Sequence, residues 1–225
     1  MVVRHSGWGW GLLLLTTTLG WGQVRQRLPN PLNLPDQTEY APSISADGRV
    51  LIFQSSRYGI FVNGARKVPV INAEGNQMAV EDKSSVDFFG LFEARRHASG
   101  EWMPPVQIEA INRYDTGLAP VMGGPSISYD GNTLFFFANY SRKGVGFGRE
   151  DIYCSQRERT GWSEPINLGP AINTPGYEGF PSISPDGRHL YFMRENLTKK
   201  GETQQVCYSL MMAEKSREGD RKSVV

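Results

Sequence analysis

The chain has 225 residues, including 25 Gly and 14 Pro, and 11% of its residues are aromatic. This length allows one or two domains with a real core, and the aromatic content is too high for a disordered chain. Lys and Arg (24) almost balance Asp and Glu (23), so the formal net charge is only +1. A neutral chain gives no electrostatic reason to expect nucleic acid or an anionic membrane surface as a partner.

Residues 1–22 have the organisation of an export signal. Arg4 supplies a basic start, four leucines at 12–15 form an apolar centre, and Gly-Trp-Gly at 20–22 offers small residues for cleavage before Gln23. The apolar centre is shorter than the roughly 20 residues of a membrane span. We therefore predict a helical signal peptide over 1–22 and a periplasmic or secreted product with no membrane segment after cleavage. An uncleaved anchor helix is the alternative.

A seven-residue phrase, PSIS-x-DG, occurs three times, beginning at Pro42, Pro125 and Pro181. The Ser-Ile-Ser alternation is the period of a half-exposed strand, and Asp-Gly after it favours a hairpin turn. Each phrase leads into an apolar run that has no alternation, and these runs are 50–53, 134–137 and 190–193. Strands of this kind need both of their faces covered.

Each unit continues beyond the apolar run with a second strand-like segment, and these segments are 90–94, 151–155 and 206–210. A polar turn follows, and in two copies a Trp (Trp102, Trp162) then precedes a proline that opens a connector strand. The connector 165–168 (Pro-Ile-Asn-Leu) resembles 31–34 (Pro-Leu-Asn-Leu), so we expect the array to begin near Pro31. The predicted units are 31–104, 105–164 and 165–225, and the first contains an insertion at about 58–88.

Radial stacking of small antiparallel sheets would cover both faces of every middle strand. We therefore predict an all-β fold over 23–225, a partial β-propeller of about three antiparallel blades. An immunoglobulin-like sandwich is the alternative, but its strands normally keep one wet face. Three blades fall short of the roughly four to eight that close a ring. The sequence predicts a truncated product, an unrecognised blade, or association with itself or a partner through open blade edges.

These phrases resemble the PD40, or WD40-like, β-propeller repeat of the TolB family. The matching residues are 181–187, 190–192, 151–153 and 162–168, and 168–174 is typical of members that occur with OmpA-like envelope domains. The last copy departs from the pattern because Arg221 stands where the other two have Trp. The resemblance implies a non-enzymatic, exported binding or scaffold module that engages an envelope protein or a peptidoglycan-related glycan.

The sequence contains no recognisable catalytic motif: no G-x-S-x-G, no H-E-x-x-H, no phosphate loop and no C-x-x-C. We expect no enzymatic activity, no cofactor and no metal, and we identify no ligand-binding residue. His97 and His189 are interpreted as solvated side chains. The repeated aspartates could suggest calcium sites, but one carboxylate per turn offers too few oxygens, and hairpin chemistry explains them. They are Asp47, Asp130 and Asp186.

Several side chains keep two interpretations. Trp102 and Trp162 could cover the outer edge of a blade or stack on sugars. Glu39 and Glu178, three residues before a signature proline, could line a propeller mouth or bond to a local turn. The two cysteines could form a disulfide or be small buried side chains. They are Cys154 and Cys207.

Three further hypotheses remain open. The insertion 58–88 could form an extra hairpin that acts as a binding loop, since specific function tends to lie in loops on a rigid scaffold. The chain could instead be a fragment of a propeller-containing hydrolase, a peptidase or glycosidase. A glycosidase would need two closely spaced acids with shifted pKa values. A translated fragment with no function of its own is the third possibility.

Overall fold

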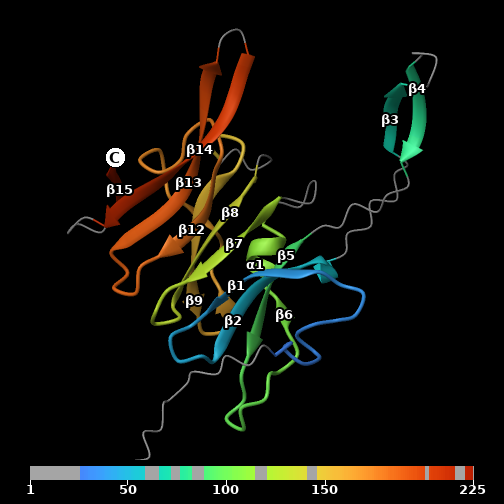
Figure 1. The fold of residues 1–225 in the computed structure, drawn as a ribbon. Helices are drawn as coiled ribbons and strands as arrows, with labels where there is room; N and C mark the ends of the chain where they lie inside the picture. The colour runs from blue at the N-terminus through green and yellow to red at the C-terminus, as the bar shows by residue number, and fades with distance from the viewer. Residues whose placement is uncertain are drawn as a thin grey trace, which may run out of the picture.

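The computed structural model describes residues 26–58, 66–71, 77–82, 89–114, 121–140, 146–200, 203–215 and 221–224. The predicted signal at 1–22 lies outside this part of the chain. Three antiparallel sheets follow one another along the described residues, and a separate two-stranded hairpin interrupts the first (Figure 1). No described helix combines the length and the apolar character that crossing a membrane requires. Over the described residues the chain is all-β, a partial β-propeller of three antiparallel blades.

The first two sheets share one strand order. The first consists of β1 (Glu39–Ile44), β2 (Val50–Ser55), β5 (Gly90–Arg95) and β6 (Val106–Gln107). The second consists of β7 (Met122–Ile127), β8 (Thr133–Ala138), β9 (Asp151–Glu158) and β10 (Gly161–Trp162), with β11 (Ile166–Asn167) also paired to β9. Each sheet therefore runs outward in chain order from its signature strand.

The third sheet repeats this order with longer strands. It consists of β12 (Glu178–Ile183), β13 (His189–Lys200), β14 (Thr203–Lys215) and β15 (Arg221–Val224). The single-turn helices η1 (Ser56–Tyr58) and α1 (Glu109–Asn112) lie in connections. In the insertion, β3 (Arg66–Ile71) pairs with β4 (Gln77–Asp82), so the extra hairpin that the sequence suggested is present.

The signature strand of each sheet carries the same irregularity. Its pairing with the next strand shifts register just before the first Ser of PSIS in β1, β7 and β12. The residue before Pro adopts a left-handed conformation each time: Ala41 (φ 51°), Gly124 (φ 54°) and Phe180 (φ 50°). Such a backbone costs on the order of 1 kcal/mol or more for a residue with a side chain. It is retained in all three blades, so the bulge belongs to the blade itself.

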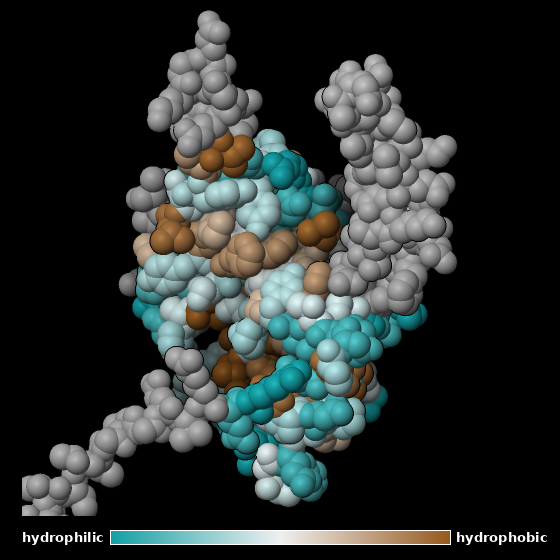
Figure 2. All heavy atoms as spheres, turned by 45° about the vertical axis from the view of Figure 1, so that its right-hand side comes forward, coloured by the Kyte–Doolittle hydropathy of each residue, from teal (hydrophilic) through white to brown (hydrophobic). Residues whose placement is uncertain are grey.

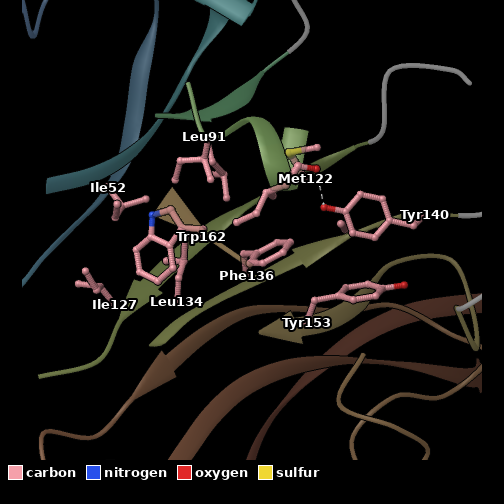
Figure 3. Packing of buried hydrophobic residues seen from close by; sticks show 12 residues of the cluster. Ile52, Leu91, Met122, Ile127, Leu134, Phe136, Tyr140, Tyr153 and Trp162 are labelled. Carbon is pink, nitrogen blue, oxygen red and sulfur yellow. Dashed lines mark hydrogen bonds between the residues drawn. The ribbon is translucent and has the colours of Figure 1, made fainter. Parts of the chain in front are cut away.

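The sheets bury one another's faces, as the apolar runs predicted. In β8, Leu134 and Phe136 belong to the core between the first and second sheets, whereas Phe135 belongs to the core between the second and third. Figure 3 shows the first of these cores, where Ile52 and Leu91 of the first sheet lie opposite Leu134 and Phe136 of the second. The signature strand β7 contacts both β1 and β12, so these three strands adjoin on one side of the stack.

The connector strands pair differently from the prediction. β6 and β11, expected to open the units that follow them, instead pair with β5 and β9 of the sheets that precede them. The sheets therefore span 39–107, 122–167 and 178–224.

The match between 31–34 and the connector 165–168 was also wrong. Leu32 and Asn33 lie in a turn in which both N–H groups donate to the Pro29 carbonyl. Ile172 and Asn173 make the same two bonds, to the Gly169 carbonyl. The true counterpart of Leu32-Asn33 is therefore Ile172-Asn173, which comes after the connector strand.

Candidate binding clefts

The PSIS-x-DG turns are built by the same three hydrogen bonds in every copy. In the first, the Ser45 hydroxyl donates to the Asp47 carboxylate (2.6 Å), which also accepts from the Arg49 N–H (3.0 Å). The Val50 N–H in turn donates to the Ser45 hydroxyl oxygen (3.0 Å). The glycine after each aspartate has a positive φ of 68°, 73° or 69°, a conformation that glycine adopts without steric cost. The glycines are Gly48, Gly131 and Gly187.

These bonds set the charge of the turns. The donated hydroxyl of Ser45 lowers the pKa of Asp47 below its ordinary 3.8, and the backbone N–H of Arg49 lowers it further. The same two causes lower the pKa of Asp130 and of Asp186. Each aspartate is therefore an anion whose Oδ1 already accepts two bonds of its own turn, which agrees with the interpretation of the aspartates as hairpin residues.

Successive turns enclose two clefts of similar size. One, of about 780 Å³, lies between the second and third turns, and the other, of about 730 Å³, lies between the first and second. The larger cleft has an apolar floor that includes Phe135, Leu168 and Ile183, and a rim with Arg188 and Lys215. The smaller cleft is lined by charged groups of both signs, including Arg95, Arg157, Arg159, Asp47 and Glu158.

Tyr129 stands between the two clefts and lines both of them. Its side chain is 66% exposed, although a tyrosine ring is large and mostly apolar. The other two signatures have Ala46 and Pro185 at this position, so the turn itself does not require an aromatic residue. Sequence reasoning missed Tyr129, and its signal was the variable x of PSIS-x-DG. An exposed ring beside polar groups can stack on a flat ligand surface.

Glu39 and Glu178 have structural roles. The Glu178 side chain is fully buried, accepts from Arg194 Nε (3.0 Å), and accepts from the hydroxyl and N–H of Thr174 (2.6 and 2.8 Å). Glu39 pairs in the same way with Arg57 (2.9 Å). Glu178 therefore holds the segment before its sheet, so the local-turn interpretation describes it. Glu39 instead bonds to Arg57 and Ser55, at the end of β2.

Trp162 is not available as a sugar platform. It is 7% exposed, its indole N–H donates to Glu93 (2.7 Å), and the Arg157 guanidinium lies 3.8 Å from the ring centre. Burial raises the pKa of Glu93, but the bonds from Arg157 and Trp162 outweigh burial and the pKa is lowered. Trp102 is half-buried and packs against the apolar back of the first sheet. Trp162 thus packs between two sheets and Trp102 against the face of one.

A group of acids lies near the other end of β9, away from the clefts. Burial raises the pKa of Glu150, the neighbouring Arg149 lowers it, and the charges of Glu195 and Asp151 raise it again. Arg149 also binds Glu195 (2.9 Å). Burial and the charge of Glu150 raise the pKa of Tyr177 to about 12. This group combines closely spaced acids with a shifted pKa.

The remaining predicted side chains form no site. His97 is exposed and bonds to Ser99 within its turn, and His189 lies 3.9 Å from Asp186. Cys154 and Cys207 are not joined by a disulfide. Among the described residues, His, Cys, Asp and Glu form no group of three that could hold a metal ion.

Comparison with known proteins identifies no family. No family model matches the chain, and no curated protein matches it. Among solved structures, a thermostable family-43 glycoside hydrolase is similar, with a TM-score of 0.45 and 14% sequence identity. The similarity covers 87% of this chain and 60% of the hydrolase. The chain therefore corresponds to less than two thirds of that protein's length.

Proposed function

We propose that this chain is a non-enzymatic, exported β-propeller module of the bacterial cell envelope that binds a peptidoglycan-related glycan or an envelope protein. The resemblance of its three signatures to PD40 repeats supports the compartment and the class of partner. The exposed Tyr129 between two clefts is the observation that carries a binding role. The neighbouring turn aspartates are engaged in bonds of their own turns, so the clefts offer recognition rather than an evident catalytic group.

The glycan is the partner that the clefts fit best. Sugars present apolar faces and hydroxyl groups, and an amphipathic ring with charged and amide groups beside it complements both. Tyr129 provides the ring, and Gln156 and Arg188 provide polar groups along the larger cleft. A strand of repeating sugars could contact both clefts because Tyr129 borders each of them.

Retention of the purified chain on peptidoglycan sacculi tests this proposal. We expect the wild-type chain to be retained and Tyr129→Ala to weaken retention by about tenfold, which corresponds to roughly 1.4 kcal/mol for a lost stacking contact. Phe147→Ala is the matched control, because Phe147 is also an exposed aromatic residue (46%) but precedes β9 at its other end. Wild-type retention no greater than that of an unrelated protein would rule out the glycan.

A second candidate, a hydrolase module, is favoured by the raised pKa of Glu150 beside Glu195 and Asp151. A carboxyl group with a raised pKa holds its proton to a higher pH than usual, which is the direction that a general acid requires. This candidate predicts turnover of nitrophenyl glycosides that Glu150→Gln abolishes and that Glu101→Gln, at an exposed position, leaves unchanged. Absence of turnover across a panel of such substrates would leave the binding module as the function.

A further inference from the structure

Each sheet has one face, here called the forward face, that points toward the next sheet in chain order. The register places corresponding side chains on this face in all three sheets. They are Ile52, Gln54 and Leu91 in the first sheet, Phe135, Phe137 and Ile152 in the second, and Tyr191, Met193 and Leu210 in the third. The first two sets are buried, whereas Tyr191 is 47% and Leu210 is 87% exposed. The forward face of the third sheet thus carries the apolar residues that the first two sheets bury, but no described sheet packs against it.

Two hydrogen-bonded links join each sheet to the next. In the first link, an Asn from the segment before a sheet bonds to both backbone groups of one residue on the third strand of the preceding sheet. Asn112 binds the N–H and C=O of Leu91 (2.9 and 3.0 Å), and Asn173 binds those of Ile152 (2.8 and 3.0 Å). All these groups are buried, so each bond satisfies a backbone group that would otherwise lose water without compensation.

The second link uses the first Ser of PSIS. The Ser43 hydroxyl accepts the N–H of Ile127 in the second sheet (3.0 Å), and the Ser126 hydroxyl accepts the N–H of Ile183 in the third (3.0 Å). The corresponding hydroxyl of the third sheet is that of Ser182, which is exposed. The corresponding N–H of the first sheet is that of Ile44, whose side chain is 53% exposed.

The segment before the first sheet carries an asparagine equivalent to those of the first link. Asn33 occupies the place of Asn173, because Leu32-Asn33 and Ile172-Asn173 share the same turn bonds. The carbonyls before these asparagines are also held alike: Arg57 donates to that of Leu32, and Arg194 to that of Ile172. Asn33 has no sheet before it in the described residues, and its amide donates to the Leu28 carbonyl (2.8 Å).

We propose that a second copy of this chain docks head to tail on the third sheet. The head is the back of the first sheet with the segment 26–38, and the tail is the forward face of the third sheet. In this contact Asn33 of the first copy bonds to the backbone of Leu210 of the second copy. The Ser182 hydroxyl of the second copy accepts the N–H of Ile44 of the first. An identical contact between the head of the second copy and the tail of the first closes a two-fold symmetric dimer of six sheets, within the size range of propeller rings.

The head offers an apolar pocket of about 120 Å³ to the tail. It is lined by Leu28 and Tyr40, which are exposed (44% and 41%), and by Leu51 and Phe53, which are largely buried in a cluster with Leu32. Leu51 and Phe53 correspond to Leu134 and Phe136, which pack in one core with Ile52 and Leu91 across the first interface (Figure 3). Tyr191 and Leu210 of the second copy would therefore contact a leucine and a phenylalanine, as their counterparts Ile52 and Leu91 do.

Apolar side chains reach the surface in several places. Figure 2 shows brown atoms among polar ones near the upper end of the molecule and in a hollow lower down. On the tail, the strongly exposed apolar side chains are Tyr191 and Leu210. A second copy fits this face better than an unrelated partner, because one chain carries the complementary halves of both links. The inference does not depend on the ligand proposed above.

Molar mass measured by light scattering over a concentration series tests the docking. We expect the wild-type chain to reach the mass of two copies. Leu210→Glu at the tail and Ile44→Glu at the head should each leave single chains, while Val121→Glu, at a 57% exposed position of the second unit, should still pair. An unchanged far-UV spectrum would show that each variant is folded.

Mixing the two defective variants tests the head-to-tail arrangement itself. One intact head and one intact tail are then present, so pairs should form in the mixture although neither variant pairs alone. A symmetric tail-to-tail contact would leave Ile44→Glu paired and would overturn the proposal. A single-chain mass at every concentration would overturn it too, and a mass that rises without limit would show an open filament in place of the closed pair.

Discussion

The second and third sheets present the same pattern of apolar residues on their forward faces, yet one face is buried and the other is exposed. Ile152 of the second sheet is fully buried, and its counterpart Leu210 is 87% exposed. Phe135 and Tyr191 differ in the same direction, at 4% and 47% exposed. The repeated sequence therefore encodes the contact between blades as well as the blade, and the third sheet carries a contact that is not made within this chain's described residues.

The largest expected difference in stability is between truncation of Ile152 and truncation of its counterpart Leu210. Ile152→Ala should lower the free energy of unfolding by about 2–5 kcal/mol, since it leaves a cavity between two sheets. Leu210→Ala should lower it by less than about 0.5 kcal/mol at concentrations where the chain is single, because the side chain is already in water. Urea unfolding measures both values. Equal losses at the two positions would contradict the difference between the faces.

The asparagines that link the sheets should differ in the same way. Asn173→Ala should cost about 1–3 kcal/mol, because the backbone groups of Ile152 stay buried without their partner. Asn33→Ala should have little effect on a single chain, since its amide bonds only to the nearby Leu28 carbonyl in the described structure. Thermal unfolding of dilute protein provides the test, and a large loss at Asn33 would mean that it already has a structural role.

The smallest effect on stability is expected from the turn aspartates. They should behave alike in all three sheets, whether the forward face of the sheet is buried or exposed. Because the pKa of each of these carboxyl groups is lowered in the folded state, each contributes stability above its ordinary pKa of 3.8 and loses it as the pH falls through the folded pKa. NMR titration should find all three below 3.8. A turn aspartate that titrates above that value would contradict the bonding of its turn.

The sequence repeat was enough to predict the blades, because periodicity reports the faces of a strand directly. Consecutive apolar residues such as Leu134 and Phe135 required cover on both sides, and the structure provides it. The three blades follow from this signal, whereas the insertion hairpin was only one possibility that the mixed composition of 58–88 suggested. The buried pairing of Glu178 with Arg194 could not be chosen over a mouth position, because the two residues meet only across paired strands.

The errors came from matching short phrases. Residues 31–34 and 165–168 look alike as letters, but one is a turn and the other a strand, and only the hydrogen bonds separate them. Tyr129 was missed for the opposite reason. The prediction rested on the residues that the three signatures share. Tyr129 occupies the position at which they differ, and that position borders both clefts.

Amide hydrogen exchange at Leu210 tests the head-to-tail contact most directly. Strand pairing places Leu210 at the position that Leu91 and Ile152 occupy in the other two sheets. The N–H groups of Leu91 and Ile152 donate to Asn112 and Asn173, respectively. The account predicts that the Leu210 amide is protected in concentrated protein and exchanges faster on dilution, while the Ile152 amide stays protected throughout. An exchange rate at Leu210 that is fast and independent of concentration would contradict it.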